Sequence, residues 1–385
     1  EARLVEVDKG VGHTLDPALL EAELTASLAR LGLARVDLYL LHNPEVAVEA
    51  RRGTAPAERL AAELAEATAE AFAWCERQAA AGRIGWYGVS SNALASPRDD
   101  PERLDLVRLW EQAEAAAAAV HGGGAAPRFA VVQLPYNLLE PEAATRANTE
   151  IAGARCTVLE AARRLDLGVV TNRPLNALAP SGGLVRLASP ESEEEAAEAE
   201  LAVERELAAV AAAEQEIDAL LEANGASERF AGGHLLSLPE ALPPALAQLH
   251  GSDQWEHVAA TVILPNVRKM GRFLHRELKG ATGWQEALDR YLQAVDRLLP
   301  AVGRLVAARS RARNEALRER LAAAVGVRGE GMSLSQIALA FCTATPGVAA
   351  TLCGMRRTAY VTDALALLAE EELPDPLALA ACARG

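Results

Sequence analysis

Apolar residues in the first half of the chain alternate between short, nearly continuous runs and longer stripes with helical spacing. Short apolar runs are typical of strands in a parallel sheet, because helices cover both faces of such a sheet. Strands that alternate with helices predict βα units, arranged in a parallel sheet or in a barrel. The runs that fit a strand are residues 4–7, 36–41, 84–89, 129–134, 168–171 and 348–352.

Two of the intervening helices carry clear boundary signals. The first has Asp16 as its N-cap, Pro17 at its first helical position and Gly32 at its end, and each residue suits that place in a helix. The second runs from about residue 56 to Gly82, with apolar residues three or four positions apart. The sequence therefore predicts a regular order of helices between the strands.

The alternation stops between residues 186 and 331, where the sequence predicts long helices and no strand of comparable quality. This segment begins with an acidic stretch at 191–195 and ends with an arginine-rich helix at 302–326. We interpret it as a helical insertion between two parts of one βα domain. The predicted division of the chain is 1–185, 186–331 and 332–385, and a capping box of Ser333 and Gln336 opens the last part.

Composition narrows the classes of partner. The chain has 385 residues, of which 50% are hydrophobic, so it can bury a sizeable core. Its 53 acidic residues outnumber its 38 basic ones, and the net charge of −15 disfavours nucleic acid and anionic membrane surfaces as partners. No apolar run is long enough to span a membrane, so we expect a soluble protein.

The cysteines are odd in number, scattered and without a CxxC pair. They predict neither a disulfide framework nor a zinc site, and no other metal site is predicted. This usage favours a reducing compartment, the cytoplasm or an organelle matrix. Because the sequence does not begin with Met, whether a targeting segment precedes Glu1 is left open. The cysteines are Cys75, Cys156, Cys342, Cys353 and Cys382.

His42 is the first candidate functional residue. It ends the apolar run VDLYLL and is followed by Asn43 and Pro44, so it lies where a strand gives way to a loop. Ligands of parallel α/β proteins bind at that carboxyl edge of the sheet. The alternative is a structural histidine, which is the commoner role of a single histidine.

Residues 27–45, SLARLGLARVDLYLLHNPE, resemble the aldo-keto reductase family, in which a helix ending S-L-x-R-L-G precedes D-L-Y-L-L-H. Agreement of several motifs in family order is stronger evidence than any one of them. The other stretches that fit the family in chain order are residues 7–9, 82–92, 132–137, 173–176 and 354–363.

The resemblance implies a (β/α)8 TIM barrel of the α/β class. The candidate strands would begin at the family's third strand, so the first two βα units would be missing from this chain. Residues 1–185 would then hold strands 3 to 7, and residues 332–385 the last unit and a C-terminal tail. Either the missing units precede Glu1, which the absent initiator Met favours, or the barrel is broken and has exposed sheet edges.

The resemblance also implies residue roles in hydride transfer from NADPH to a carbonyl. Lys9 would lower the pKa of a tyrosine that donates the proton, and His42 would orient the substrate oxygen. None of the five tyrosines stands in the family's motif, so the tyrosine and its aspartate would lie upstream, and the residues shown would be inactive alone. A solvated surface lysine is the alternative for Lys9.

The cofactor contacts implied by the resemblance fall into three groups: carboxamide ligands, a pyrophosphate loop, and a basic loop for the 2′-phosphate of NADPH. Each residue also has a purely structural alternative, such as shaping a turn. Two departures from the family weaken the expected contacts with the cofactor. Asn172 stands where many relatives have an aromatic residue that stacks on the nicotinamide, and Ala364 stands where an asparagine often contacts the adenine. The expected contacts are Ser91, Asn92 and Gln133, then Arg173, Pro174 and Leu175, then Gly354, Arg356, Arg357, Tyr360 and Asp363.

Two functional hypotheses follow. The first is an NADPH-dependent oxidoreductase that reduces an aldehyde, ketone or sugar carbonyl to an alcohol, or catalyses the reverse reaction, on a small-molecule substrate. The second is a non-catalytic, cofactor-sensing or scaffold protein that binds a partner, or itself, through residues 186–331. A regulatory subunit of another protein is also compatible with the sequence.

Overall fold

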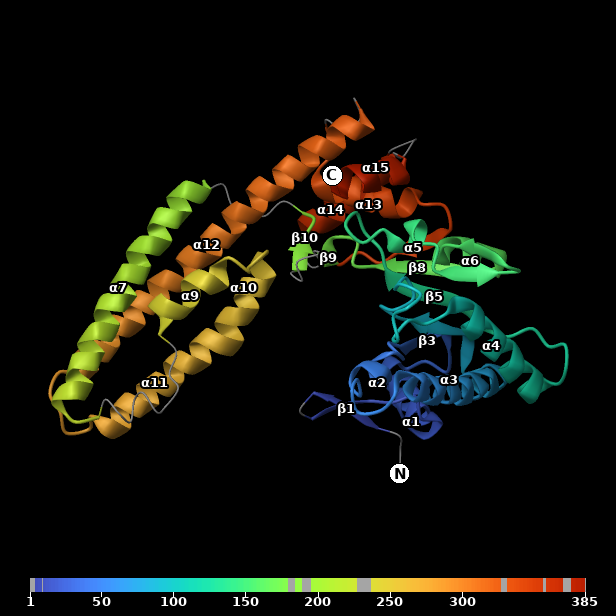
Figure 1. Ribbon diagram of the computed structural model, residues 1–385, viewed down its shortest axis with the longest axis horizontal. Helices are drawn as coiled ribbons and strands as arrows, with labels where there is room; N and C mark the ends of the chain where they lie inside the picture. The colour runs from blue at the N-terminus through green and yellow to red at the C-terminus, as the bar shows by residue number, and fades with distance from the viewer. Residues whose placement is uncertain are drawn as a thin grey trace. The chain divides into compact units, whose positions relative to one another are not determined.

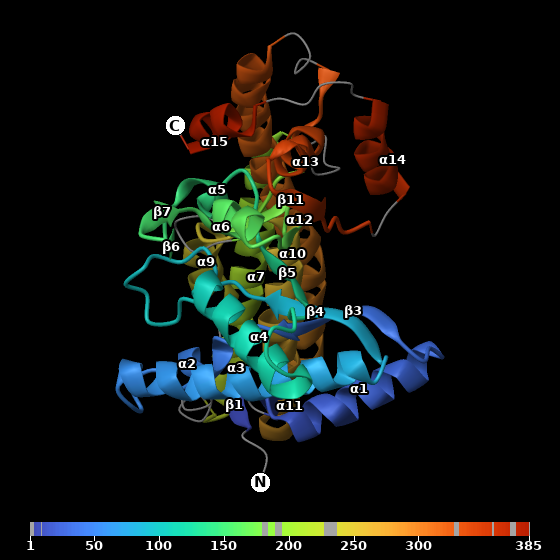
Figure 2. The same cartoon turned by 90° about the vertical axis from the view of Figure 1, so that its right-hand side faces the viewer.

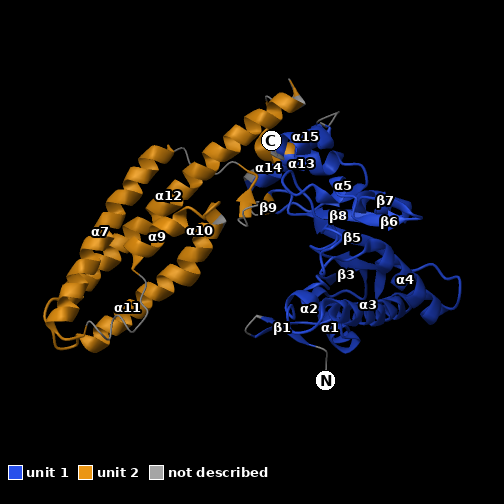
Figure 3. Cartoon of the chain, in the orientation of Figure 1, with its two compact units in different colours: residues 1–175, 338–385 blue, residues 176–337 orange. Residues whose placement is uncertain are grey.

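The computed structural model describes residues 4–8, 10–178, 184–188, 195–226, 237–326, 331–355, 358–369 and 375–384. The chain separates into two compact units, shown in different colours in Figure 3. Unit 1 comprises residues 1–175 and 338–385, and unit 2 comprises residues 176–337. The helical segment predicted at 186–331 lies within unit 2.

A parallel sheet of five strands forms the centre of unit 1. Its strand order is β11-β8-β5-β4-β3, and every neighbouring pair is parallel. Five of the predicted strands are thereby confirmed, and so is the α/β class. Within the described residues no strand joins β3 to β11, so this barrel-type sheet is open. The strands are β3 (Val36–His42), β4 (Ile84–Ser90), β5 (Phe129–Pro135), β8 (Gly168–Asn172) and β11 (Val348–Thr351).

The strand predicted at residues 4–7 forms, but the expectation that it is a further parallel strand of the barrel is wrong. β1 (Val5–Asp8) pairs antiparallel with β2 (Val11–His13) in a separate two-stranded sheet. Gly10, with φ of 77°, supplies the left-handed backbone that the tight connection requires. A local hairpin satisfies its backbone groups without the long crossover that a parallel pair needs.

Helix α1 of unit 1 begins and ends where its capping residues predict. The Asp16 side chain accepts a hydrogen bond from the Ala18 amide at 2.8 Å, and Gly32 ends α1 with φ of 67°. α3 packs against β4, α1 and α4 (Figure 2). The helices are α1 (Pro17–Leu31), α2 (Val46–Glu49), α3 (Ala57–Ala80), α4 (Leu106–His121), α5 (Glu142–Thr145), α6 (Val158–Arg164), α14 (Thr358–Ala366) and α15 (Pro376–Arg384), with a 3₁₀ turn at Leu367–Ala369.

A hairpin of two short strands and one further helix complete this part of the chain. β6 (Thr149–Ile151) and β7 (Ala154–Cys156) form an antiparallel hairpin between β5 and α6. α13 (Leu334–Ala344) precedes β11 and begins with the predicted capping box, because Ser333 and Gln336 exchange hydrogen bonds.

The core of unit 1 lies between α3 and the sheet. Phe72, Tyr87 and Phe129 are buried, with ring centroids 5.3–5.6 Å apart. Glu76, on α3, is fully buried beside them and accepts hydrogen bonds from the Tyr87 hydroxyl at 3.0 Å and the Arg128 amide at 2.8 Å. A carboxylate in this position is stable because its oxygens are hydrogen-bonded.

Unit 2 is built around two long helices, α7 (Ala196–Ala223) and α12 (Trp284–Val325) (Figure 1). Ion pairs join Glu200 to Arg309 at 2.6 Å and Glu206 to Arg297 at 2.9 Å, so the helices run antiparallel. The Glu200–Arg309 pair is exposed and contributes little stability, and the buried apolar residues along both helices contribute most of it. The remaining elements are β9 (Asn176–Leu178), β10 (Leu184–Arg186), α9 (Leu238–Leu246), α10 (Ser252–Val258), a π-helical turn (Ala259–Ile263) and α11 (Leu264–Glu277). None of the described helices could cross a membrane.

Candidate active site

The predicted ligand-binding residues gather at the carboxyl edge of the parallel sheet. In the sheet register His42 lies opposite Ser90, Ser90 opposite Gln133, and Pro135 opposite Asn172. Neighbouring parallel strands end at one edge, so residues far apart in the sequence become neighbours there. The structure therefore brings the β3, β4, β5 and β8 parts of the predicted site together.

His42 is exposed at the end of β3. The turn that follows is held in place, since the Asn43 amide donates a hydrogen bond to the Ser90 carbonyl at 2.7 Å. The His42 carbonyl accepts a hydrogen bond from Nε2 of His13 at 2.9 Å. Its backbone is thus fixed while its imidazole is accessible, as a residue that contacts a ligand requires.

Ser91 and Asn92 continue directly from β4. Ser91 is buried, and its hydroxyl oxygen accepts a hydrogen bond from the Ala93 amide at 2.9 Å, so part of its role is to shape the turn. Asn92 is exposed, and its main-chain N–H donates to a carboxyl oxygen of Glu45 at 2.9 Å. The same edge thus offers one buried hydroxyl and one accessible carboxamide.

Gln133 is half-buried near the end of β5, and its side-chain amide donates to the Ser90 hydroxyl at 3.0 Å. This contact joins the side chains of two neighbouring strands. The predicted carboxamide ligands therefore lie on adjacent segments of one edge.

The loop after β8 has a different electrostatic arrangement from the expected one. Arg173, with φ of 56°, forms an ion pair with Glu140 at 3.3 Å, and its carbonyl accepts from the Asn137 side chain at 3.2 Å. Its Nε atom is buried and makes no hydrogen bond to a described residue. The same is true of the side-chain oxygen of Asn172. Pro174 is buried. The buried Nε is therefore unsatisfied within the described residues, and Glu140 neutralises much of the charge of Arg173.

The remaining predicted residues are only partly described. Leu175 is half-buried in unit 1, Gly354 is exposed after β11, and Tyr360 and Asp363 are half-buried on α14. Lys9, Arg356 and Arg357 lie outside the described residues. Their predicted roles rest on the sequence.

Two residues at this edge were not predicted, His13 and Glu45. Glu45 is 4% exposed, and burial raises the pKa of its carboxyl, while the charge that His13 can carry opposes that shift. The sequence did offer a signal for Glu45. It is an acidic residue two positions after the dipeptide His42-Asn43, which ends a predicted strand. His13 had no comparable signal, because the hairpin alone brings it to this edge.

Two cavities border these segments. One of about 630 Å³ is lined by the β1–β2 hairpin, the residues around α2 and one side of α3, with His13 in its wall. Another of about 400 Å³ lies between α3 and the segment that connects β4 to α4. The first adjoins the carboxyl edge of the sheet through His13, whose Nε2 donates to the His42 carbonyl.

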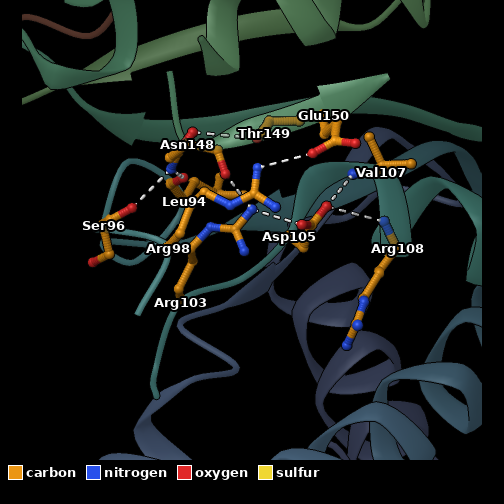
Figure 4. Close-up of polar contacts among 10 residues, drawn as sticks. All are labelled: Leu94, Ser96, Arg98, Arg103, Asp105, Val107, Arg108, Asn148, Thr149 and Glu150. Atoms are coloured by element: carbon orange, nitrogen blue, oxygen red, sulfur yellow. Dashed lines mark hydrogen bonds and ion pairs between the residues drawn. The ribbon is translucent and has the colours of Figure 1, made fainter. Parts of the chain in front are cut away.

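The segment between β4 and α4 is held rigidly by polar contacts (Figure 4). The Asn148 side chain donates to the carbonyls of Leu94 and Ser96, both at 2.8 Å. Arg103 donates to the Asn148 carbonyl and to Asp105, both at 2.6 Å, and Asp105 caps α4. This network fixes the chain that leaves Asn92.

The fold and this edge define a class, an α/β protein of βα units with polar strand ends gathered at one edge of a parallel sheet. A family model described as "Aldo/keto reductase family" matches residues 5–225, more than half of the chain. The protein belongs to the aldo/keto reductase family. The resemblance seen in the sequence motifs is thereby confirmed.

Two solved structures with similarity to the chain have related descriptions. A thermostable aldo-keto reductase in complex with the inhibitor epalrestat is 13% identical, with a TM-score of 0.38, and the match covers 95% of this chain and 65% of that one. A glycerol dehydrogenase from Gluconobacter oxydans is 18% identical, with a TM-score of 0.27 over 45% of this chain and 38% of that one. The chain thus spans less than two thirds of either structure. No curated protein sequence matches it.

Proposed function

We propose that the protein is an NADPH-dependent oxidoreductase that interconverts a small-molecule carbonyl and an alcohol. Membership of the aldo/keto reductase family supports this class of reaction. The observation that carries the proposal is the register of the sheet, which gathers His42, Asn92 and Gln133 at one carboxyl edge. A substrate-orienting residue and cofactor ligands must be neighbours for hydride transfer.

The donor set suits a nicotinamide cofactor. A carboxamide needs both donors and acceptors, and the side chains of Asn92 and Gln133 supply both, beside the hydroxyl of Ser91. The guanidinium of half-buried Arg173 can donate to a phosphate oxygen. When bound, NADPH supplies the hydride, and these residues orient the ring and exclude water from one face.

On the substrate side, His42 is proposed to donate a hydrogen bond to the carbonyl oxygen and so orient it. The proton donor must be another group. Tyr87, Tyr136 and Tyr291 are buried in the cores, and burial raises the pKa of Tyr39 to about 12. We propose that a tyrosine donates the proton and that Lys9 lowers its pKa.

Titration with NADPH, followed by cofactor fluorescence, tests the proposal. We expect saturable binding with a Kd in the micromolar range, about −8 kcal/mol. Absence of binding at high micromolar NADPH, with circular dichroism showing an intact fold, would refute it.

His42→Ala in the full-length protein is expected to lower turnover by about a hundredfold or more while NADPH affinity changes little. The reason is that the imidazole is exposed at the edge and its proposed contact is with the substrate. Steady-state kinetics and NADPH titration of the same preparation measure both quantities. Loss of the folded state would instead favour a structural role for this histidine.

Replacing Arg356 and Arg357 together by alanine is expected to weaken NADPH binding about tenfold or more and NADH binding far less. Only NADPH carries the 2′-phosphate that two guanidinium groups can bind. Parallel titrations with the two cofactors measure the ratio. An equal effect on both would contradict the proposed cofactor preference.

The ion pair between Arg173 and Glu140 favours a second candidate, a non-catalytic family member. An arginine neutralised in this way binds a pyrophosphate less strongly, and unit 2 would then serve as a surface for a partner or for self-association. Such a protein would bind NADPH without turnover. The buried thiols of Cys75, Cys156 and Cys342 support a reducing compartment for either candidate.

A further inference from the structure

A buried carboxylate links two segments of the candidate site. Glu45 lies in the turn after β3, three residues after His42, and only 4% of its surface is exposed. Its Oε1 atom accepts the hydrogen bond from the Asn92 amide at 2.9 Å, across a sequence separation of 47 residues. Oε2 is also buried and hydrogen-bonds to no described residue.

A carboxylate in this place is unfavourable for stability alone. Burial raises the pKa of the Glu45 carboxyl, which means that the charged form loses more solvation than its contacts return. An apolar side chain of similar size would fill the space without this penalty. A role in the geometry of the site explains why an acid stands here.

His13 is the second polar group at this junction. Its Nε2 faces the His42 carbonyl, which can only accept, so Nε2 carries the proton. Its Nδ1 is buried and has no hydrogen-bond partner in the described part of the chain. Burial raises the pKa of the Glu45 carboxyl, and an electrostatic interaction with His13 is a smaller effect that opposes this rise. Together they connect the main chain beside His42 with the main chain at Asn92.

We infer that Glu45 is a positioning residue for cofactor binding, because its carboxylate holds the Asn92 main chain in the place from which the Asn92 carboxamide contacts the nicotinamide. His13, in the β1–β2 hairpin, supports this arrangement through its hydrogen bond to the His42 carbonyl. The inference rests on the proposed binding of NADPH. It assigns a role in cofactor binding to the turn after β3. That turn directly follows His42, whose proposed role is to orient the substrate.

Two substitutions separate the hydrogen bond from packing and charge. Glu45→Met keeps the approximate volume and removes the acceptor, whereas Glu45→Gln keeps an acceptor oxygen and removes the charge. Glu49→Ala, at an exposed position on α2, is the matched control. Circular dichroism melting establishes that each variant is folded.

The first measurement is hydrogen exchange at the Asn92 amide, which does not require a ligand. We expect exchange to be about tenfold faster or more in Glu45→Met and close to wild type in Glu45→Gln and Glu49→Ala. Unchanged exchange in a folded Glu45→Met variant would overturn the inference. If that variant does not fold, faster exchange in Glu45→Gln would overturn the assignment to the oxygen acceptor.

The second measurement is the Kd for NADPH by fluorescence. We expect Glu45→Met to weaken binding about tenfold, and Glu45→Gln to stay within about threefold of wild type. Faster exchange without any change in Kd would show a purely structural role. Failure of the wild-type protein to bind NADPH would refute the proposed function, while the exchange data would still decide whether Glu45 holds Asn92.

Discussion

Glu76→Ala is expected to destabilise unit 1 by about 3–5 kcal/mol. Glu76 is fully buried on α3 and accepts hydrogen bonds from the Tyr87 hydroxyl and the Arg128 amide, and its other oxygen lies 3.0 Å from Nε2 of His121. Alanine removes the shared partner and leaves the buried Tyr87 hydroxyl and the Arg128 amide without one inside the protein, whereas the exposed His121 can bind water. Each unsatisfied buried donor lowers the free energy of unfolding.

Urea denaturation followed by tryptophan fluorescence and circular dichroism measures the loss. Glu66→Ala, at an exposed position on the same helix, is the control and should change the free energy of unfolding by less than about 0.5 kcal/mol. Because the chain has two compact units, the two probes should be fitted separately if their transitions do not coincide. Equal stability of the Glu76 and Glu66 variants would contradict the proposed role of the buried carboxylate.

Gly88→Ala is expected to separate β4 from β5 and to lower the free energy of unfolding by at least about 3 kcal/mol. A Cβ atom at Gly88 would lie 1.9 Å from the Val131 carbonyl oxygen, which belongs to the neighbouring strand. Backbone atoms inside a sheet cannot move aside as the end of a flexible side chain can. The strands must therefore shift, and with them Ser91 and Gln133.

Gly168→Ala provides the control in the same sheet. Its Cβ would meet its nearest neighbour at 3.7 Å, which is ordinary van der Waals contact, so the change should stay within about 1 kcal/mol. Expression yield in soluble form and urea denaturation of both variants give the comparison. A Gly88 variant as stable as the Gly168 variant would show that the β4–β5 pairing tolerates a side chain.

The strands and their order could be predicted because the signals are local. The run at 36–41 is mostly apolar and bounded by turn residues, and similar runs mark β4, β5 and β8. The ends of α1 were predictable for the same reason, since Asp16 and Gly32 act within one helical turn. The antiparallel pairing of β1 was not, because its apolar residues do not show which strand lies beside them.

The candidate site was predictable where it follows from strand ends. His42, Ser91 and Gln133 are each near the end of an apolar run, and parallel pairing places such ends together. The ion pair of Arg173 with Glu140 was not predictable, because it depends on two loops that meet only in the folded chain.

The sequence by itself determined the βα order, the helix boundaries and the family, because each depends on residues within one element or one short motif. Only the tertiary structure decided that Glu45 holds Asn92, that Glu76 joins Tyr87 to His121, and that the first strand forms a hairpin. Glu45 and Asn92 are 47 residues apart, and the sheet register brings them within 2.9 Å. Contacts of this kind depend on how strands pair, and strand pairing depends on the whole core that the sheet and its helices bury together.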